Sequence, residues 1–162
     1  MVPNSPLFAQ KASKSWNLLT RLLLGITDNL LWNDKQNYLA EDLAESLLNS
    51  LFFAFLQGGI YTDELWKKFA SCFKLWCHRL KCVLVWGTVI VSLTSQIAKA
   101  LYSTSSDPSD NLEIVFGMHS AEYRVITDLK FANYSWIRLT SNQQTINYRP
   151  IFIIISRFLA ES

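Results

Sequence analysis

Apolar side chains recur at helical intervals over residues 13–102, in four consecutive segments separated by short polar breaks. On one face, the first segment, Ser13–Trp32, carries Trp16, Leu19, Leu23, Ile26 and Leu30. Leu18 and Leu22 widen this face, so we expect the helix to pack against two neighbours. The polar run Asn33–Asn37 predicts a short turn, and short connections favour antiparallel helices.

The second segment, Tyr38–Gln57, places apolar side chains at four-residue steps, namely Leu43, Leu47, Leu51 and Phe55. Its acidic residues, Glu41, Asp42 and Glu45, lie near the N-terminal end, where the helix dipole favours negative charge. The second half of the segment is apolar on all sides and must be covered by other elements. Gly58 and Gly59 then predict a helix stop in which a glycine adopts a positive φ.

A third helix is predicted to begin after Thr62, an N-cap residue followed by Asp63 and Glu64 in the first turn. The side chains that we expect it to bury are Trp66, Phe69, Phe73 and Trp76. Those expected on its solvent face are Lys67, Ser71, Lys74 and His78. Residues 77–81 are compatible with a kink, a turn or continuous helix.

The fourth segment, Leu80–Tyr102, has to be tested as a membrane span. Its uncharged run, residues 82–98, is seventeen residues long, whereas a bilayer needs about 20 apolar residues. One face carries Val83, Trp86, Ile90, Leu93, Ile97 and Leu101, and the other carries Lys81, Thr88, Ser92, Ser95 and Lys99. A polar stripe along the whole length favours a helix that packs on protein, so we do not expect a membrane partner.

Beyond Ser103 the periodicity weakens. Ser120 is a candidate start for a fifth helix, and Pro150 for a sixth that runs through Leu159. The alternative is that three short segments are strands, because β-branched and aromatic residues dominate them: Glu113–Phe116, Tyr134–Leu139 and Ile151–Ile155. We favour helix and leave the alternative open.

These patterns divide the chain into an N-terminal arm (residues 1–12), a four-helix repeat region (13–103), a linker (104–119) and further helices (120–162). Paired amphipathic helices with short turns, none able to bury its apolar face alone, predict an all-α fold. We expect a HEAT/armadillo-like helical-repeat segment, an α-solenoid, although no repeat of fixed period is legible. The C-terminal end shows no polar cap, so we expect the chain to continue into a longer protein.

Composition narrows the classes of function. The chain has 162 residues, of which 50% are hydrophobic, so one domain with a core is expected. A net charge of +2 is too small to indicate a nucleic-acid partner. Three cysteines are an odd number, which argues against a disulfide framework and favours a reducing, cytoplasmic location.

No constellation with the spacing of a catalytic or metal site is legible. The residues that suggest zinc are Cys72, Cys77, His78 and Cys82. On one helix Cys72 and Cys77 point about 140° apart, and no C-x-x-C pair is present, so we predict packing roles and no metal. His78 and His119 lack a nucleophile and an orienting partner, so we predict no catalytic residues, no cofactor and no enzyme.

A basic stripe of Lys67, Lys68, Lys74, Arg79 and Lys81 is expected to be a solvated helix face. Contact with an acidic partner or a membrane surface is the alternative to that interpretation.

The order of several short motifs resembles one family. They begin with Ser15-Trp16-x-x-Leu19 and Leu22-Leu23-x-x-Ile26-x-Asp28-x-Leu30-Leu31. They continue with Leu39-Ala40-Glu41-x-Leu43-Ala44-Glu45-x-Leu47, Leu51-Phe52, Leu65-Trp66, Trp76-x-His78, Trp86 and Leu93-Thr94. This series resembles the N-terminal region of the Ral GTPase-activating protein subunits, and is more similar to the non-catalytic β subunit than to the α subunit.

The resemblance implies a non-catalytic scaffold or regulatory segment that supports the activation of Ral-type small GTPases. Its implied partner is the catalytic α subunit of a heterodimeric complex, and through it the Ral GTPase. The structural core implied for this segment comprises Trp16, Leu23, Ile26, Leu43, Leu47, Trp66, Phe69, Trp76, Trp86 and Leu93. The alternatives are a generic helical-repeat adaptor in signalling or trafficking and a membrane-associated protein.

Overall fold

The protein, described here from a computed structural model over residues 6–32, 38–102, 111–117 and 121–141, is mostly helical with one small sheet. The helices are α1 (Pro6–Leu31), α2 (Tyr38–Gln57), α3 (Asp63–Trp76), α4 (Leu80–Tyr102) and α5 (Leu129–Thr140). Strands β1 (Asn111–Phe116) and β2 (Tyr123–Asp128) pair as an antiparallel hairpin. The predicted helical class is therefore confirmed, with a hairpin added to it.

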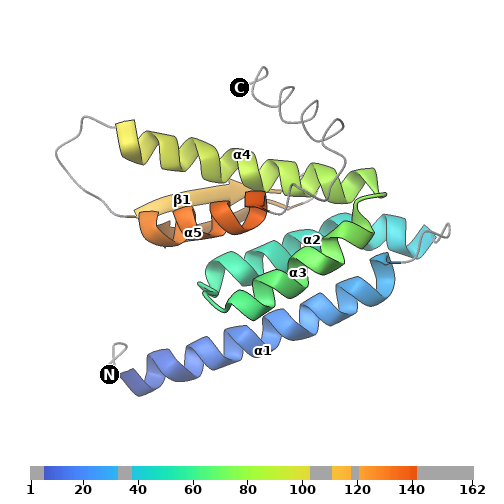
Figure 1. Ribbon diagram of the computed structural model, residues 1–162, viewed down its shortest axis with the longest axis horizontal. Coiled ribbons are helices and arrows are strands. Elements are labelled where there is room, and N and C mark those ends of the chain that lie inside the picture. Colours follow the sequence, from blue (N-terminus) through green and yellow to red (C-terminus); the bar gives the residue numbers. More distant parts are fainter. Residues whose placement is uncertain (1–5, 33–37, 103–110, 118–120, 142–162) are drawn as a thin grey trace.

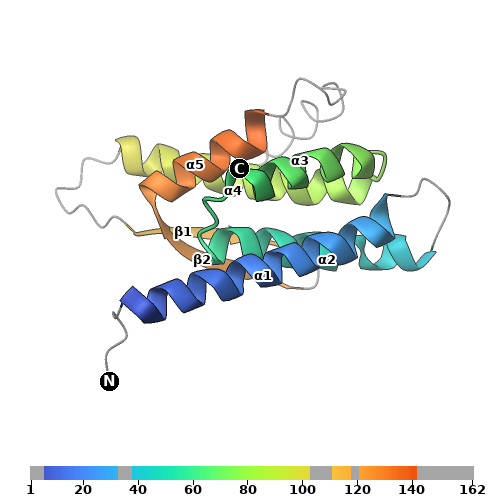
Figure 2. The ribbon, with the colours of Figure 1, turned by 60° about the horizontal axis from the view of Figure 1, so that its bottom comes forward.

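The first four helices run up and down, each antiparallel to the one before it (Figure 1). They form two layers, with α1 and α2 in one and α3 and α4 in the other (Figure 2). Across the layers α1 contacts α3, and α2 contacts α4. The hairpin also connects the two layers, because β1 packs on α4 and β2 packs on α2. Helix α5 lies against α4 and the hairpin.

The glycine pair after α2 ends that helix, as predicted. Gly59 has φ +56°, which a residue with a side chain adopts only with strain. Gly58 is required for a different reason: a Cβ there would lie 2.6 Å from the carbonyl oxygen of Ala54 and 2.9 Å from the Cβ of Trp16. The end of α2 can therefore lie directly against α1.

A turn separates α3 from α4, so of the three forms considered for residues 77–81 the turn is the one observed. Helix α3 ends at Trp76, whose carbonyl accepts a hydrogen bond from the backbone N–H of Arg79 at 2.9 Å. The segment is thus a tight turn, after which α4 begins at Leu80 and returns along the second layer.

Aromatic rings from α2, α3 and α4 form the centre of the core. The rings of Phe55 and Trp66 lie 4.4 Å apart between centroids, and those of Phe69 and Phe73 lie 5.6 Å apart. Of the residues expected in the core, the buried ones are Trp66, Phe69, Trp76, Trp86 and Leu93. Those that lie half-buried are Trp16, Leu23 and Leu47.

Two expected core residues, Ile26 and Leu43, lie at the surface, with 42% and 37% of their area exposed. On α1 the buried line is instead Thr20, Leu24, Thr27 and Leu31. The sequence pattern predicted the wrong buried face of α1 because two of these positions are threonines. Each threonine hydroxyl is satisfied by the carbonyl oxygen four residues earlier, at 2.7 Å. On α2 the buried line includes Ala40, Ala44 and Leu48.

The C-terminal third departs from the favoured helical prediction. Strand β1 lies inside the region expected to be a linker, and β2 occupies residues expected in a fifth helix, so both assignments are wrong there. The strand alternative was right for Glu113–Phe116 and wrong for Tyr134–Leu139, which lies in α5. Segment Ile151–Ile155 and the sixth helix lie outside the described residues.

Tertiary contacts explain the hairpin. The alternating buried residues of β1 are Leu112, Ile114 and Phe116, and they face the helices. Two strands are marginal in isolation and need a covering layer, which α4, α2 and α5 supply.

Candidate functional site

The cysteines serve packing. Among the described residues, no group of three or more His, Cys, Asp or Glu side chains could hold a metal ion. Cys72 and Cys77 are half-buried and Cys82 is buried. Burial raises the pKa of the Cys72 and Cys77 thiols to about 11 and that of Cys82 to about 12, so all three stay protonated at neutral pH. A protonated, buried thiol behaves as a small hydrophobe.

One half-buried carboxylate joins two helices. Asp28 of α1 accepts a hydrogen bond from the indole Nε1–H of Trp76 in α3, at 3.0 Å. The ring of Trp76 is fully buried, and the bond satisfies its polar edge. This contact fixes α3 on α1, while the imidazole of His78 lies at the exposed surface.

Arg79 was assigned to the solvated basic stripe, and that assignment is wrong, because only 4% of the residue is exposed. Its Nε–H donates to the carbonyl oxygen of Leu31, at 3.3 Å, and its guanidinium forms an ion pair with Glu41. The side chain therefore ties the end of α1 and the beginning of α2 to the α3–α4 turn. Lys67, Lys68, Lys74 and Lys81 are exposed, as expected.

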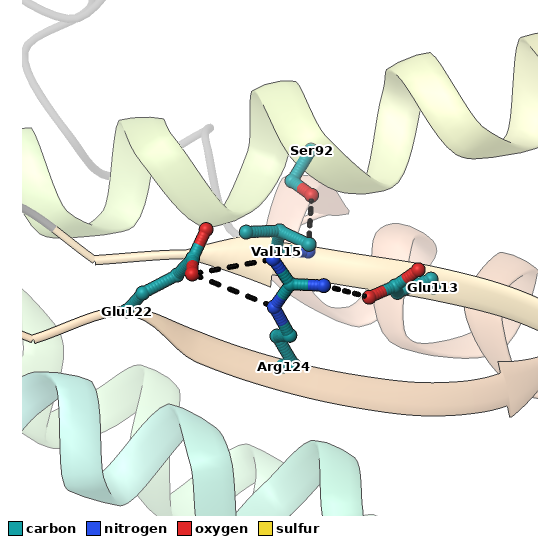
Figure 3. A network of polar contacts seen from close by, with 5 residues as sticks. All are labelled: Ser92, Glu113, Val115, Glu122 and Arg124. Carbon is teal, nitrogen blue, oxygen red and sulfur yellow. Dashed lines mark hydrogen bonds and ion pairs between the residues drawn. The ribbon is translucent and has the colours of Figure 1, made fainter.

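A polar network holds the hairpin together and joins it to α4 (Figure 3). Arg124 of β2 forms ion pairs with Glu113 of β1 at 2.8 Å and with Glu122 at 3.3 Å. The backbone N–H of Val115 donates to the hydroxyl oxygen of Ser92 in α4, at 3.0 Å. All three charged side chains are about half exposed or more, so the network fixes geometry and adds little stability.

Helix α5 is joined to the first residue of α3 by a second polar cluster. The hydroxyl of Tyr134 donates to Oδ1 of Asp63 at 2.8 Å, and Arg138 forms an ion pair with the same carboxylate. The hydrogen bond from Tyr134 lowers the pKa of Asp63 below its ordinary value. Within α5 itself, the side chain of Asp128 caps the first turn by accepting from the N–H of Phe131 at 2.7 Å.

The polar groups described so far act within the fold, whereas one apolar face has no cover among the described residues. It is the outer α1 face, which we define as Ser15, Leu18, Leu22, Gly25 and Asn29. Leu18 and Leu22 are 70% and 60% exposed, and Leu19 and Ile26, beside them, are each 42% exposed. The expectation that α1 packs against two neighbours is confirmed, since α1 contacts α2 and α3. Leu18 and Leu22 lie on the side of α1 that these two helices leave open.

Pattern alone could have located this face, since Leu18 and Leu22 were recognised as widening the apolar stripe of α1. What the pattern could not indicate is which side of the stripe faces the core. That depends on Thr20 and Thr27, which count as polar in a sequence and are fully buried in the structure.

Helix α4 is, within the described residues, long and apolar enough to cross a membrane. In this structure it packs against α2, β1 and α5. Its buried residues include Val85, Trp86 and Val89 in its N-terminal half. A central core helix of this kind meets the same length and composition criteria as a membrane span.

Comparison with known proteins identifies the family. The RALGAPB N-terminal domain matches residues 8–104, more than half of the chain and nearly all of α1–α4. The chain is also 26% identical over 150 residues to a Rap-GAP domain-containing protein of Dictyostelium discoideum, a match that covers 90% of this chain and 9% of that relative. No solved structure matches the chain. The resemblance found in the sequence is thereby confirmed, and the chain belongs to the RALGAPB N-terminal domain family.

Proposed function

We propose that this chain is a non-catalytic segment of a GTPase-activating complex for Ral-type small GTPases. The observation that carries the proposal is the family match over α1–α4. The relative from Dictyostelium discoideum bears a Rap-GAP domain in its name, which is consistent with a small-GTPase context. This chain spans 9% of that relative's length, so activity on a GTPase would belong to the longer protein and its partners.

The geometry supports a binding role over a catalytic one. Completing a GTPase site requires a side chain that can reach the transferred phosphoryl group. Several of the polar side chains with such potential are engaged within the fold: Asp28 with Trp76, and Arg79 with Leu31 and Glu41. The outer α1 face offers apolar surface to a partner instead.

The partner in this proposal is the catalytic α subunit of a heterodimeric complex, with this chain as a β-type subunit segment and the cytoplasm as its location. We further propose that the four helices form part of an α-solenoid in the longer protein. The layered packing of α1 and α2 on α3 and α4 supports such stacking, and repeat units of this kind bury their faces against neighbours.

Co-purification tests the proposal. The chain would be co-expressed with a catalytic Ral GTPase-activating α subunit, and the purified material assayed for GTP hydrolysis by Ral. We expect a stable complex, no acceleration of hydrolysis by the chain alone, and a faster rate with the catalytic subunit present. Acceleration by the chain alone would refute the non-catalytic role.

Two other results would favour the alternatives. Complex formation with other proteins and none with the catalytic subunit would favour a generic adaptor. Retention of the chain in the membrane fraction after carbonate extraction would favour an α4 that spans the bilayer.

A further inference from the structure

We propose that the outer α1 face docks an amphipathic helix of a partner protein, and that the docked helix carries carboxylates on the flank that meets Lys14 and Arg21. The inference deepens the proposed function by naming the surface on which this segment holds a partner.

The spacing of the outer α1 face suits a helix. Its five residues recur at intervals of three and four, which places them in one line along α1. A second helix that lies along such a line can pack its side chains between those of α1. Leu18 and Leu22 are the large apolar side chains of this line, and both are mostly exposed.

Gly25 is the observation that points to a close neighbour. A glycine in the middle of a helix lowers helix stability relative to alanine. Its backbone does not adopt a positive φ, and a Cβ at this position would meet nothing within 4 Å. Gly58 differs, because a Cβ there would lie 2.6 Å from a backbone oxygen. The described residues thus give no reason for glycine at position 25, whereas a helix packed directly on the α1 backbone would.

Charge beside this face selects the partner. A shallow groove next to Leu18 is lined by Lys14, Asn17, Leu18, Arg21 and Thr62. Lys14 is exposed, and Arg21 has one carboxylate neighbour, Glu64, at 3.6 Å. A second copy of this chain would bring the same basic flank to the contact, and like charges oppose association. A helix with carboxylates on that flank is complementary.

A membrane surface fits this face less well. Basic residues beside leucines also occur on helices that lie in a lipid interface. Such helices insert a continuous row of large apolar side chains, whereas this line has Ser15, Gly25 and Asn29 among its leucines. Small residues contribute almost nothing to insertion and allow two backbones to approach.

Two labelled synthetic peptides provide the test. Each is a helix of about 20 residues, long enough to be substantially helical, with leucine and alanine along one stripe. One has glutamate on both flanks and the other has lysine. Binding to the full 162-residue chain is followed by fluorescence anisotropy at low salt. We expect the glutamate peptide to bind at least about tenfold more tightly than the lysine peptide.

Matched variants locate the site. Leu22→Gln should weaken binding of the glutamate peptide by about tenfold or more, because it removes apolar contact at the centre of the line. Leu101→Gln is the control, since Leu101 of α4 is also 60% exposed and lies outside α1. It should leave binding unchanged.

Gly25→Leu separates docking from folding. Leucine has a higher helix propensity than glycine and meets open space here, so the melting temperature of the chain should rise. The new side chain should also block close approach and abolish peptide binding. A lower melting temperature would show that the fold itself needs Gly25, and would overturn the inference.

Several other results would also overturn it. They are equal binding of the two peptides, no binding of either, or unchanged binding by Leu22→Gln. Self-association that Leu22→Gln removes would assign the face to a second copy, and loss of binding to phosphatidylserine vesicles in the same variant would assign it to lipid. If peptide docking holds while co-purification with the catalytic subunit fails, the proposed function falls and this inference remains.

Discussion

Helices α1 and α4 are both long and rich in apolar residues, yet their surroundings differ. Helix α4 packs against α2, β1 and α5, whereas α1 packs against α2 and α3 and leaves one face open. The buried residues of α4 include Trp86 and Leu93, while Leu18 and Leu22 of α1 remain exposed. The comparison teaches that the apolar content of a helix predicts that it needs to be buried. Whether it is buried within the chain depends on how many elements pack against it.

The largest expected effect contrasts two tryptophans. Trp86→Ala should cost about 3–5 kcal/mol of unfolding free energy, because the ring is 1% exposed and its Nε1–H donates to the carbonyl oxygen of Leu139. Trp16→Ala should cost roughly 1–3 kcal/mol, since Trp16 is half-buried against Phe53. Urea unfolding followed by circular dichroism measures both, and equal losses would contradict the difference between the helices.

A pair of leucines makes the comparison more direct. Leu93→Ala on α4 should cost about 2–5 kcal/mol, because the side chain is fully buried and its removal leaves a cavity. Leu22→Ala on the outer α1 face should change stability by no more than about 0.5 kcal/mol. Thermal unfolding of the purified variants distinguishes the two. A comparable loss from Leu22→Ala would mean that the chain covers this face itself.

Arg79 links the two helices, since it precedes α4 and bonds to the end of α1. Arg79→Ala should cost roughly 1–3 kcal/mol, because the carbonyl oxygen of Leu31 loses its donor and Glu41 its partner. This loss of unfolding free energy is smaller than that for a fully buried ion pair, because the Glu41 side chain is 46% exposed. Lys74→Ala is the exposed control and should change stability by less than about 0.5 kcal/mol in the same urea titration.

The smallest expected effect concerns Thr27, one of the two threonines on the buried face of α1. Thr27→Val should change stability by less than about 1 kcal/mol, because the lost hydroxyl donates to the carbonyl oxygen of Leu23. In the valine variant that oxygen still accepts the backbone hydrogen bond of the helix. Thr27→Ser should cost about 0.8 kcal/mol for the lost buried methyl group. If serine proved the more stable replacement in denaturant unfolding, the hydroxyl of Thr27 would contribute more to stability than its methyl group.

Local signals in the sequence determined most of the boundaries of α2, α3 and α4, whereas α1 begins at Pro6, inside the expected N-terminal arm, so the predicted start at Ser13 is wrong. Helix α2 has the predicted bounds, Tyr38–Gln57, and its end is set locally because Gly59 adopts a positive φ. Thr62 takes the predicted N-cap position, although its hydroxyl donates to Asn17 of α1 and makes no capping bond. Spacing at three and four residues placed Trp66, Phe69 and Trp76 on one face of α3, and all three are buried.

Tertiary structure alone decided which side of α1 is buried and which segment forms the hairpin. Ile26, expected in the core, is exposed, and Thr27 is buried beside it, because α2 and α3 bury the side of the helix on which Thr27 lies and its hydroxyl is satisfied within α1. Strand β1 forms because α4 covers its alternating side chains and Ser92 binds the N–H of Val115. Arg79 and Asp28 likewise acquire their roles from partners tens of residues away. Local periodicity encodes a residue's own helix, whereas burial and pairing depend on distant segments that only the folded chain brings together.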